Sequence, residues 1–172
     1  MDKILPGLLV LSVIIVAFAL IAAGWRNRLR RQADVERLPQ VPEQLTPATV
    51  VAEGQYVATT TAGDWLDRIA VQGLGIRTNA ELSIHREGVL FDRSGGAPVF
   101  IPRSALTDSH ETDGMAGKFV EKGGLLVISW KLGSRELDTG FRSRHAADKQ
   151  LLLEAIQELI SAAPQADADS GK

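Results

Sequence analysis

A long apolar run near the start of the chain constrains its fold more than any other feature. From Ile4 to Trp25 the sequence has 22 residues without a charged side chain, and Ser12 alone carries a hydroxyl there. A helix of that length rises by roughly 33 Å, which matches the ~30 Å hydrocarbon core of a bilayer. The run is apolar on all sides, so a helix has no polar face to turn toward water. We therefore predict a transmembrane helix over residues 1–25, with residues 4–25 in contact with the lipid bilayer.

The residues on either side of this run predict its orientation. Only Asp2 and Lys3 precede it, and Trp25 stands where indole rings prefer the membrane interface. Four arginines follow at once: Arg26, Arg28, Arg30 and Arg31. They can bind anionic headgroups at the membrane surface, and the positive-inside rule places them in the cytoplasm. We predict a single-pass protein of the plasma membrane, with its N-terminus outside and its C-terminal domain in the cytoplasm.

A cleaved signal peptide is the alternative interpretation of this segment. Residues 17–19 read Ala-Phe-Ala, which fits the small-x-small pattern of a cleavage site. However, Lys3 is the only basic residue before the apolar run, and the run continues past Ala19 into the arginines. An anchor fits these features better than an exported protein whose signal has been removed.

The average composition of the chain hides two unlike parts. The 172 residues are 45% hydrophobic, carry a net charge of −2 and include no cysteine. Residues 1–31 have a net charge of +4, so residues 32–172 have −6. The acidic second part argues against nucleic-acid binding, and the hydrophobic share is too high for a disordered chain. The lack of cysteine excludes a disulfide scaffold, a thiolate zinc site and a cysteine nucleophile.

Composition also divides the rest of the chain into three segments. Residues 26–47 begin with the basic cluster, then carry charges of both signs and three prolines, as expected of a linker. Residues 164–172 are small and polar, so we expect a disordered tail. The remaining residues, 48–163, are enough for one independent domain.

Short segments rich in β-branched and aromatic residues occupy most of residues 48–163. The predicted strands are Tyr56–Thr60, Glu81–Arg86, Val89–Asp92, Val99–Ile101, Phe119–Glu121, Leu125–Leu132 and Leu137–Arg142. From Arg144 to Ala163 the apolar residues change to helical spacing, and Pro164 ends the pattern. One amphipathic helix after several short strands needs a curved sheet to cover. The sequence therefore predicts a mainly β fold with a C-terminal α-helix, a small bent antiparallel barrel or sandwich with one end plugged by the helix.

Two stretches of this domain resemble bacterial pleckstrin-homology-like (PH-like) domains. SIHREGVLFDRSGGAPVFIPRSAL, residues 83–106, is similar to their middle strands, and LLVISWKLGSRELDTGFRSR, residues 125–144, is similar to their closing strands. With the N-terminal span, the whole chain resembles actinobacterial membrane-anchored PH-like proteins, which are often described only as membrane, export or transporter proteins. The resemblance implies a PH-like barrel over residues 48–163 and a role in binding.

One departure from this family bears on the ligand. PH domains that bind phosphoinositides carry clustered Lys and Arg in and beside the first hairpin loop. The corresponding stretch here, residues 59–73, offers Arg68 alone beside Asp64 and Asp67. We therefore do not expect phosphoinositide binding, and we expect a protein as the partner.

The sequence contains no catalytic or cofactor motif that we can identify. It has no G-x-S-x-G, and its histidines, His85, His110 and His145, are too far apart for a zinc motif. The acidic stretch at residues 107–114 is typical of a solvated loop. Residues 73–78 begin like a dinucleotide fingerprint, but a threonine stands where the third glycine belongs. We predict no enzyme activity, no cofactor and no metal.

Trp65 is the best candidate for contact with a partner. It lies in a turn-rich stretch between charges, and Asp64, Trp65 and Arg68 are the predicted partner-binding residues. The other interpretation, which the residues alone favour, is that Trp65 folds back over the barrel end with Leu66 and Ile69. The function we predict is a tethered, non-catalytic binding or scaffolding module. An accessory subunit of a membrane transport or envelope-assembly complex remains an alternative, as does the exported protein.

Overall fold

The chain forms two compact units, Met1–Asp34 and Val35–Lys172. The structure is a computed structural model that describes residues 4–32, 35–119 and 121–162. The predicted tail, residues 164–172, lies outside these residues.

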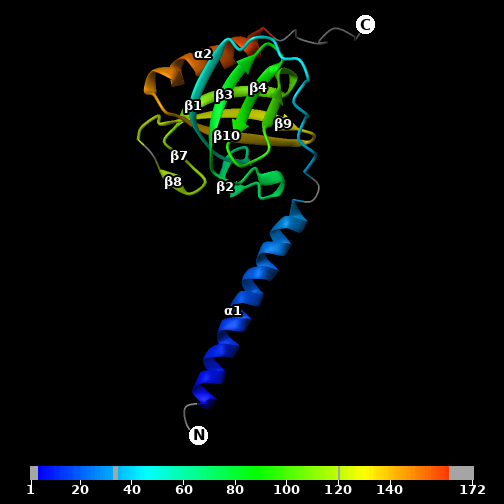
Figure 1. Ribbon diagram of the computed structural model, residues 1–172, viewed down its shortest axis with the longest axis vertical. Helices are drawn as coiled ribbons and strands as arrows, with labels where there is room; N and C mark the ends of the chain where they lie inside the picture. The colour runs from blue at the N-terminus through cyan, green and yellow to red at the C-terminus, as the bar shows by residue number, and fades with distance from the viewer. Residues whose placement is uncertain (1–3, 33–34, 120, 163–172) are drawn as a thin grey trace. The chain divides into compact units, whose positions relative to one another are not determined.

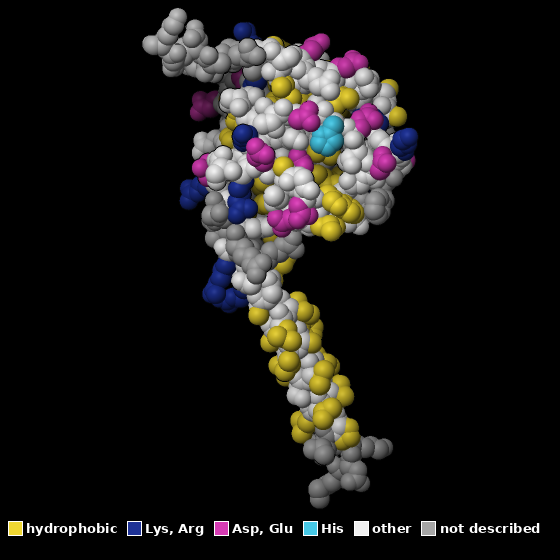
Figure 2. Space-filling model, turned by 180° about the vertical axis from the view of Figure 1, so that it is seen from behind, with side chains coloured by type: hydrophobic (Ala, Val, Ile, Leu, Met, Phe, Trp, Pro, Cys, Tyr) yellow, Lys and Arg dark blue, Asp and Glu magenta, His cyan; other side chains and the backbone are white. Residues whose placement is uncertain are grey.

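The first unit consists of one helix, α1 (Ile4–Arg31). Within the described residues it is the one helix long and apolar enough to cross a membrane, over Pro6–Asn27, and a signal sequence near the N-terminus would meet the same criterion. Apolar side chains cover its length in Figure 2. The helix runs six residues beyond the predicted end at Trp25, because arginine favours helix and no proline intervenes before Pro39. The four arginines of the predicted membrane-surface cluster therefore all belong to α1.

The second unit is a strongly curved antiparallel sheet (Figure 1). Its strands lie side by side in the order β5-β4-β3-β1-β10-β9-β6, β2 pairs with β1 alone, and β7 and β8 form a separate hairpin. The strands are β1 (Val50–Thr61), β2 (Asp64–Arg68), β3 (Thr78–His85), β4 (Gly88–Arg93), β5 (Val99–Pro102), β6 (Leu106–Thr112), β7 (Gly114–Met115), β8 (Lys118–Phe119), β9 (Leu125–Leu132) and β10 (Arg135–Ser143). Two 3₁₀ turns, η1 (Val71–Gly73) and η2 (Arg103–Ala105), connect β2 to β3 and β5 to β6.

Strand β1 joins the two halves of the sheet. Its first half pairs with β3, from Val50 opposite Ile84 onward, and its second half pairs with β10 as far as Thr61 opposite Leu137. At Gly54, β1 is paired with both β3 and β10. A Cβ at this position would collide with the carbonyl oxygen of Arg142. Only glycine allows this close approach of the backbones, so this position lets the sheet curl around its core.

The helix α2 (Ala146–Ser161) covers one end of the curled sheet (Figure 1). Leu152 and Ile156 are fully buried, and they join the aromatic core residues Tyr56, Phe91, Trp130 and Phe141. This confirms the predicted fold class, a mainly β barrel plugged by a C-terminal helix.

The globular unit begins before the predicted domain boundary at residue 48. Val35 is buried in the core, the backbone amide of Leu38 donates to Gln72 Oε1 at 2.8 Å, and the Gln72 amide group donates to the carbonyl of Glu36 at 2.6 Å. Further along, Thr46 donates from its backbone and its hydroxyl to Glu87 at 3.1 and 2.9 Å. Residues 35–49 thus form a strap across the barrel, where the sequence predicted the second half of a linker.

Candidate functional site

The connection from β1 to β3 closes one end of the barrel. Within it Ile69 and Leu74 are fully buried. The backbone amide of Ile69 donates to the carbonyl of Thr59, and that of Thr59 donates to the carbonyl of Leu74, at 2.9 and 2.8 Å. The segment that carries the predicted partner-binding residues is therefore fastened to the core on both sides of η1.

A chain of buried hydrogen bonds reaches this segment from the opposite strands. Trp130 Nε1 donates to Thr139 Oγ1 at 2.9 Å, the hydroxyls of Thr139 and Thr59 lie 2.8 Å apart, and those of Thr59 and Tyr56 lie 2.6 Å apart. Tyr56 then donates to the carbonyl of Leu74 at 2.9 Å. Because an indole N–H only donates and a carbonyl only accepts, all three hydroxyls must point the same way. Burial raises the pKa of Tyr56 to about 12, although the Thr59 hydrogen bond and Arg93 oppose the shift.

Arg93 lies beside this network, and it is buried, with 4% of its surface exposed. Its Nε donates to the carbonyl of Ala97 and its Nη1 to that of Gly73, both at 2.8 Å, and its guanidinium lies 4.8 Å from the centre of the Tyr56 ring. The cation holds two loops together and is not presented to solvent.

The predicted partner-binding residues lie on β2 and divide into supports and exposed side chains. Asp64 Oδ1 accepts hydrogen bonds from the backbone amides of Leu66 and Asp67 at 3.1 and 3.2 Å. Arg68 donates to the carbonyls of Gly75 and Ala116 at 3.3 and 3.1 Å. Asp64 and Arg68 therefore fix the shape of β2 and its attachment to neighbouring segments.

Trp65 and Leu66 are the exposed pair on this strand. Trp65 is 39% exposed and Leu66 is 60% exposed, whereas Ile69 is fully buried. The carbonyl of Trp65 accepts a hydrogen bond from the amide of Ala116 at 2.8 Å, so the backbone beneath the pair is held. The second interpretation of the sequence grouped these three apolar residues over the barrel end; of the three, the structure buries Ile69 and leaves Trp65 and Leu66 exposed.

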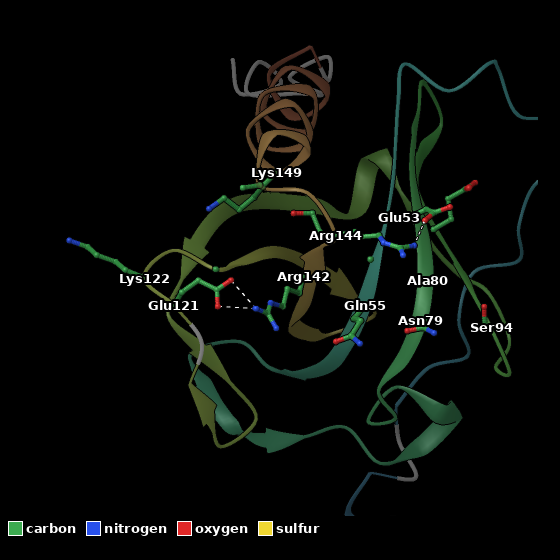
Figure 3. Close-up of a pocket in the computed structure, with 15 residues that line it drawn as sticks. Glu53, Gln55, Asn79, Ala80, Ser94, Glu121, Lys122, Arg142, Arg144 and Lys149 are labelled. Atoms are coloured by element: carbon green, nitrogen blue, oxygen red, sulfur yellow. Dashed lines mark hydrogen bonds and ion pairs between the residues drawn. The ribbon is translucent and has the colours of Figure 1, made fainter.

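A polar pocket of about 890 Å³ lies elsewhere, between β1, β3, the end of β10, the loop before β9 and the start of α2 (Figure 3). Its charged lining residues are Glu53, Glu81, Glu121, Lys122, Arg142, Arg144 and Lys149. Sequence reasoning did not find it, because its walls come from segments far apart in the chain.

Ion pairs link the walls of this pocket. Arg142 Nη2 lies 3.0 Å from both carboxylate oxygens of Glu121, and Arg144 Nη1 lies 3.0 Å from Glu53 Oε2. Lys149 Nζ lies 3.2 Å from Glu111 Oε1. The pKa of Glu121 is lowered by a hydrogen bond from its own backbone amide and by Arg142, which outweigh its desolvation. The carboxylate of Glu121 is thus held as an anion.

The described residues contain no group of three or more His, Asp or Glu side chains able to hold a metal ion. The stretch at residues 107–114 includes strand β6 instead of the predicted loop, and its acidic side chains separate. Asp108 lies 3.5 Å from His110, while Glu111 turns to Lys149. His85 bonds to the carbonyl of Thr46 at 2.7 Å, which gives it a structural contact with the strap.

A family model described as "Bacterial PH domain-like" matches residues 35–157. The chain belongs to the bacterial PH domain-like family. The match begins at the first residue of the globular unit, so the strap is part of the domain in the family as well as in this structure.

Similarity to solved structures is one of fold, at very low sequence identity. A chain of the 8S snRNP assembly intermediate is 7% identical with a TM-score of 0.54, covering 79% of this chain and 98% of that chain. The C-terminal PH domain of the human FYVE, RhoGEF and PH domain containing protein 3 is 9% identical with a TM-score of 0.42, covering 73% and 100%. No curated protein matches the sequence. PH-like domains are generally non-catalytic binding modules that take lipids or proteins, which agrees with the predicted class of function.

Proposed function

We propose that this chain is a membrane-anchored, non-catalytic module whose PH-like domain binds a protein partner on the cytoplasmic side of the plasma membrane. The anchor is α1, and the arginines at its end set the orientation by the positive-inside rule. Confinement to the membrane raises the local concentration of the domain, so that a weak contact reaches useful occupancy.

The exposed pair Trp65 and Leu66 is the observation that carries this proposal. Two large apolar side chains at successive positions are exposed on a short strand whose backbone is fixed by Asp64, Arg68 and Ala116. A rigid aromatic anchor loses little conformational entropy when it is covered, and such residues contribute most of the energy at many protein interfaces. Acidic residues beside the pair, Asp64 and Asp67, disfavour an anionic lipid surface as its partner.

Site-specific photocrosslinking of the full-length chain in native membranes tests this proposal. A photoreactive residue in place of Leu66 is expected to give a discrete crosslinked band, and Trp65→Ala is expected to weaken that band about tenfold, the equivalent of ~1.4 kcal/mol. The matched control is the same photoreactive residue in place of Leu151, an α2 side chain that is 53% exposed. Identical bands from both positions, or a band that is indifferent to Trp65→Ala, would refute the role of this strand.

A further inference from the structure

The polar pocket concentrates basic side chains in a domain that is otherwise acidic. Four of its seven charged residues are Arg or Lys, whereas residues 32–172 as a whole carry a net charge of −6. In Figure 3 Arg142 and Arg144 extend from the end of β10 between the other walls, while Lys122 points outward. The two arginines are therefore the groups best placed to meet a ligand.

These arginines present a repeated arrangement. They are two residues apart: Arg142 lies on β10, and Arg144 follows the last residue of β10, with its backbone amide donating to the carbonyl of Glu53 at 2.8 Å. Each holds one carboxylate from a different wall, Glu121 from the loop before β9 and Glu53 from β1. The pocket thus already holds carboxylates of its own chain at two neighbouring positions.

Both ion pairs are open to exchange. The side chains of Arg142 and Glu121 are 41% and 61% exposed, and those of Arg144 and Glu53 are 69% and 67% exposed. Exposed ion pairs contribute little to stability, so opening them costs the fold little. Within the described residues the side-chain amide of Asn79, which also lines the pocket, has no hydrogen-bond partner and could bind the backbone of a peptide.

The rest of the lining narrows the chemistry of the ligand. The apolar residues among those that line the pocket are Ala80 and Ala146, so it offers neither an aromatic ring to stack on a base nor a surface for an acyl chain. Glu53, Glu81 and Glu121 also line the pocket, so a group that concentrates several negative charges meets more repulsion than single carboxylates spaced along a backbone. A peptide with single carboxylates offers the same chemical group that Arg142 and Arg144 already bind in Glu121 and Glu53.

We propose that this pocket binds an acidic segment of a protein partner, with carboxylates on alternate residues that replace Glu121 and Glu53 on Arg142 and Arg144. This inference rests on the proposed function in so far as the partner is a protein, and it assigns that partner a second contact, separate from Trp65. Glu121 acts as an internal competitor that keeps the pocket closed to weakly acidic chains.

Fluorescence anisotropy with the purified full-length chain in neutral detergent micelles tests the pocket. The probe is a labelled peptide that alternates Asp and Ala, and the control probe carries Asn in place of each Asp. We expect the Asp peptide to bind, the Asn peptide to bind at least about tenfold more weakly, and added salt to weaken the Asp peptide. Arg142→Gln should weaken binding about tenfold, since a charge-assisted contact is lost.

Glu121→Gln distinguishes an internal competitor from a merely structural ion pair. Removing the competitor frees Arg142, so the Asp peptide should bind a few fold more tightly than it binds the unmodified chain. Lys131→Gln and Glu136→Gln change the same charges in an exposed pair at 3.3 Å outside the pocket, and they should leave binding unchanged. Circular dichroism melting of each variant separates a lost contact from a lost fold.

Several outcomes would overturn the inference. Unaltered or weaker binding by Glu121→Gln, or equal effects of the variants at Lys131 and Glu136, would show that no carboxylate exchange takes place. Arg142-dependent binding of inorganic tripolyphosphate without binding of the Asp peptide would assign the pocket to phosphates instead. Trp65→Ala should not change binding of the peptide, so a failure of the Leu66 crosslink and a failure of the pocket can be told apart.

Discussion

At the scale of single residues, Tyr56 connects several parts of the domain through its ring and its hydroxyl. Its hydroxyl is the last member of a hydrogen-bond chain that begins at Trp130 and ends on the carbonyl of Leu74. Its ring packs edge-on against Phe91, with centroids 5.5 Å apart, beneath the guanidinium of Arg93. One side chain thus joins the core of the barrel to the segment that presents Trp65.

Alkaline titration tests this role. The pKa of Tyr56 is raised to about 12 in the folded state from 10.0, so the neutral hydroxyl is stabilised by folding. That contribution is complete below pH 10 and is lost as the pH rises through 12. The chain has one tyrosine, so tyrosinate absorbance reports this residue alone. The tyrosinate absorbance should appear between pH 10 and pH 12, together with the loss of the near-UV circular dichroism signal.

The variant Tyr56→Phe removes the titrating group and leaves both the Thr59 hydroxyl and the Leu74 carbonyl without this partner. We expect a loss of about 1–3 kcal/mol in the free energy of unfolding at neutral pH, together with a flatter pH dependence above pH 10. Free ionisation near pH 10 with the fold intact would contradict the burial of this hydroxyl.

At the scale of elements, the sequence predicted those with strong internal patterns. The run LLVISWKL became β9 at the predicted bounds, and the apolar stripe near the C-terminus became α2. Strand β6 was missed because it lies at the edge of the sheet. Its side chains are mostly polar and exposed, and only Leu106 and Ser109 are buried, so it lacks the alternation of a half-buried strand.

The short strand β2 and the polar pocket were missed for a different reason. Leu66 stays exposed, so β2 has no core-facing pattern, and its position depends on contacts with Gly75 and Ala116. Arg142 and Glu121 are 21 residues apart, and they meet only because of the register of β10 and the path of the loop before β9. No local periodicity reports such a meeting, whereas Asp64, Trp65 and Arg68 were predicted from their place in one turn-rich stretch between charges.

Helix α2 should contribute strongly to stability through one face. Leu152→Ala or Ile156→Ala removes a fully buried side chain and should cost about 2–5 kcal/mol by denaturant unfolding. Leu151→Ala, on the exposed side of the same helix, should stay within about 0.5 kcal/mol. Comparable losses at both positions would mean that α2 does not pack as described.

At the scale of the whole molecule, the two candidate contact sites of the globular unit differ in chemistry. The globular unit is acidic overall. Its exposed apolar pair, Trp65 and Leu66, and the polar pocket are formed by different segments of the chain. A partner that met both would need an apolar patch and an acidic stretch. Each contact alone can be weak, because a partner held at one contact meets the other at a raised effective concentration. The proposed membrane tether would act in the same direction.

The strap of residues 35–49 determines which N-terminal truncations leave the globular unit stable. Its member Val35 packs in the core, and Thr46 donates two hydrogen bonds to Glu87. Desolvation raises the pKa of Glu87, but the Thr46 bonds, a bond from its own backbone amide and the nearby His85 together lower it. A soluble fragment that starts at residue 35 should therefore melt as one cooperative unit. A fragment that starts at residue 48 should melt several degrees lower, since it uncovers core surface around Val35 and leaves the side chain of Gln72 unpaired. Limited proteolysis of the full-length chain should accordingly release a fragment that keeps the strap, and the N-terminal residue of that fragment, identified by mass spectrometry, would mark where the globular unit begins.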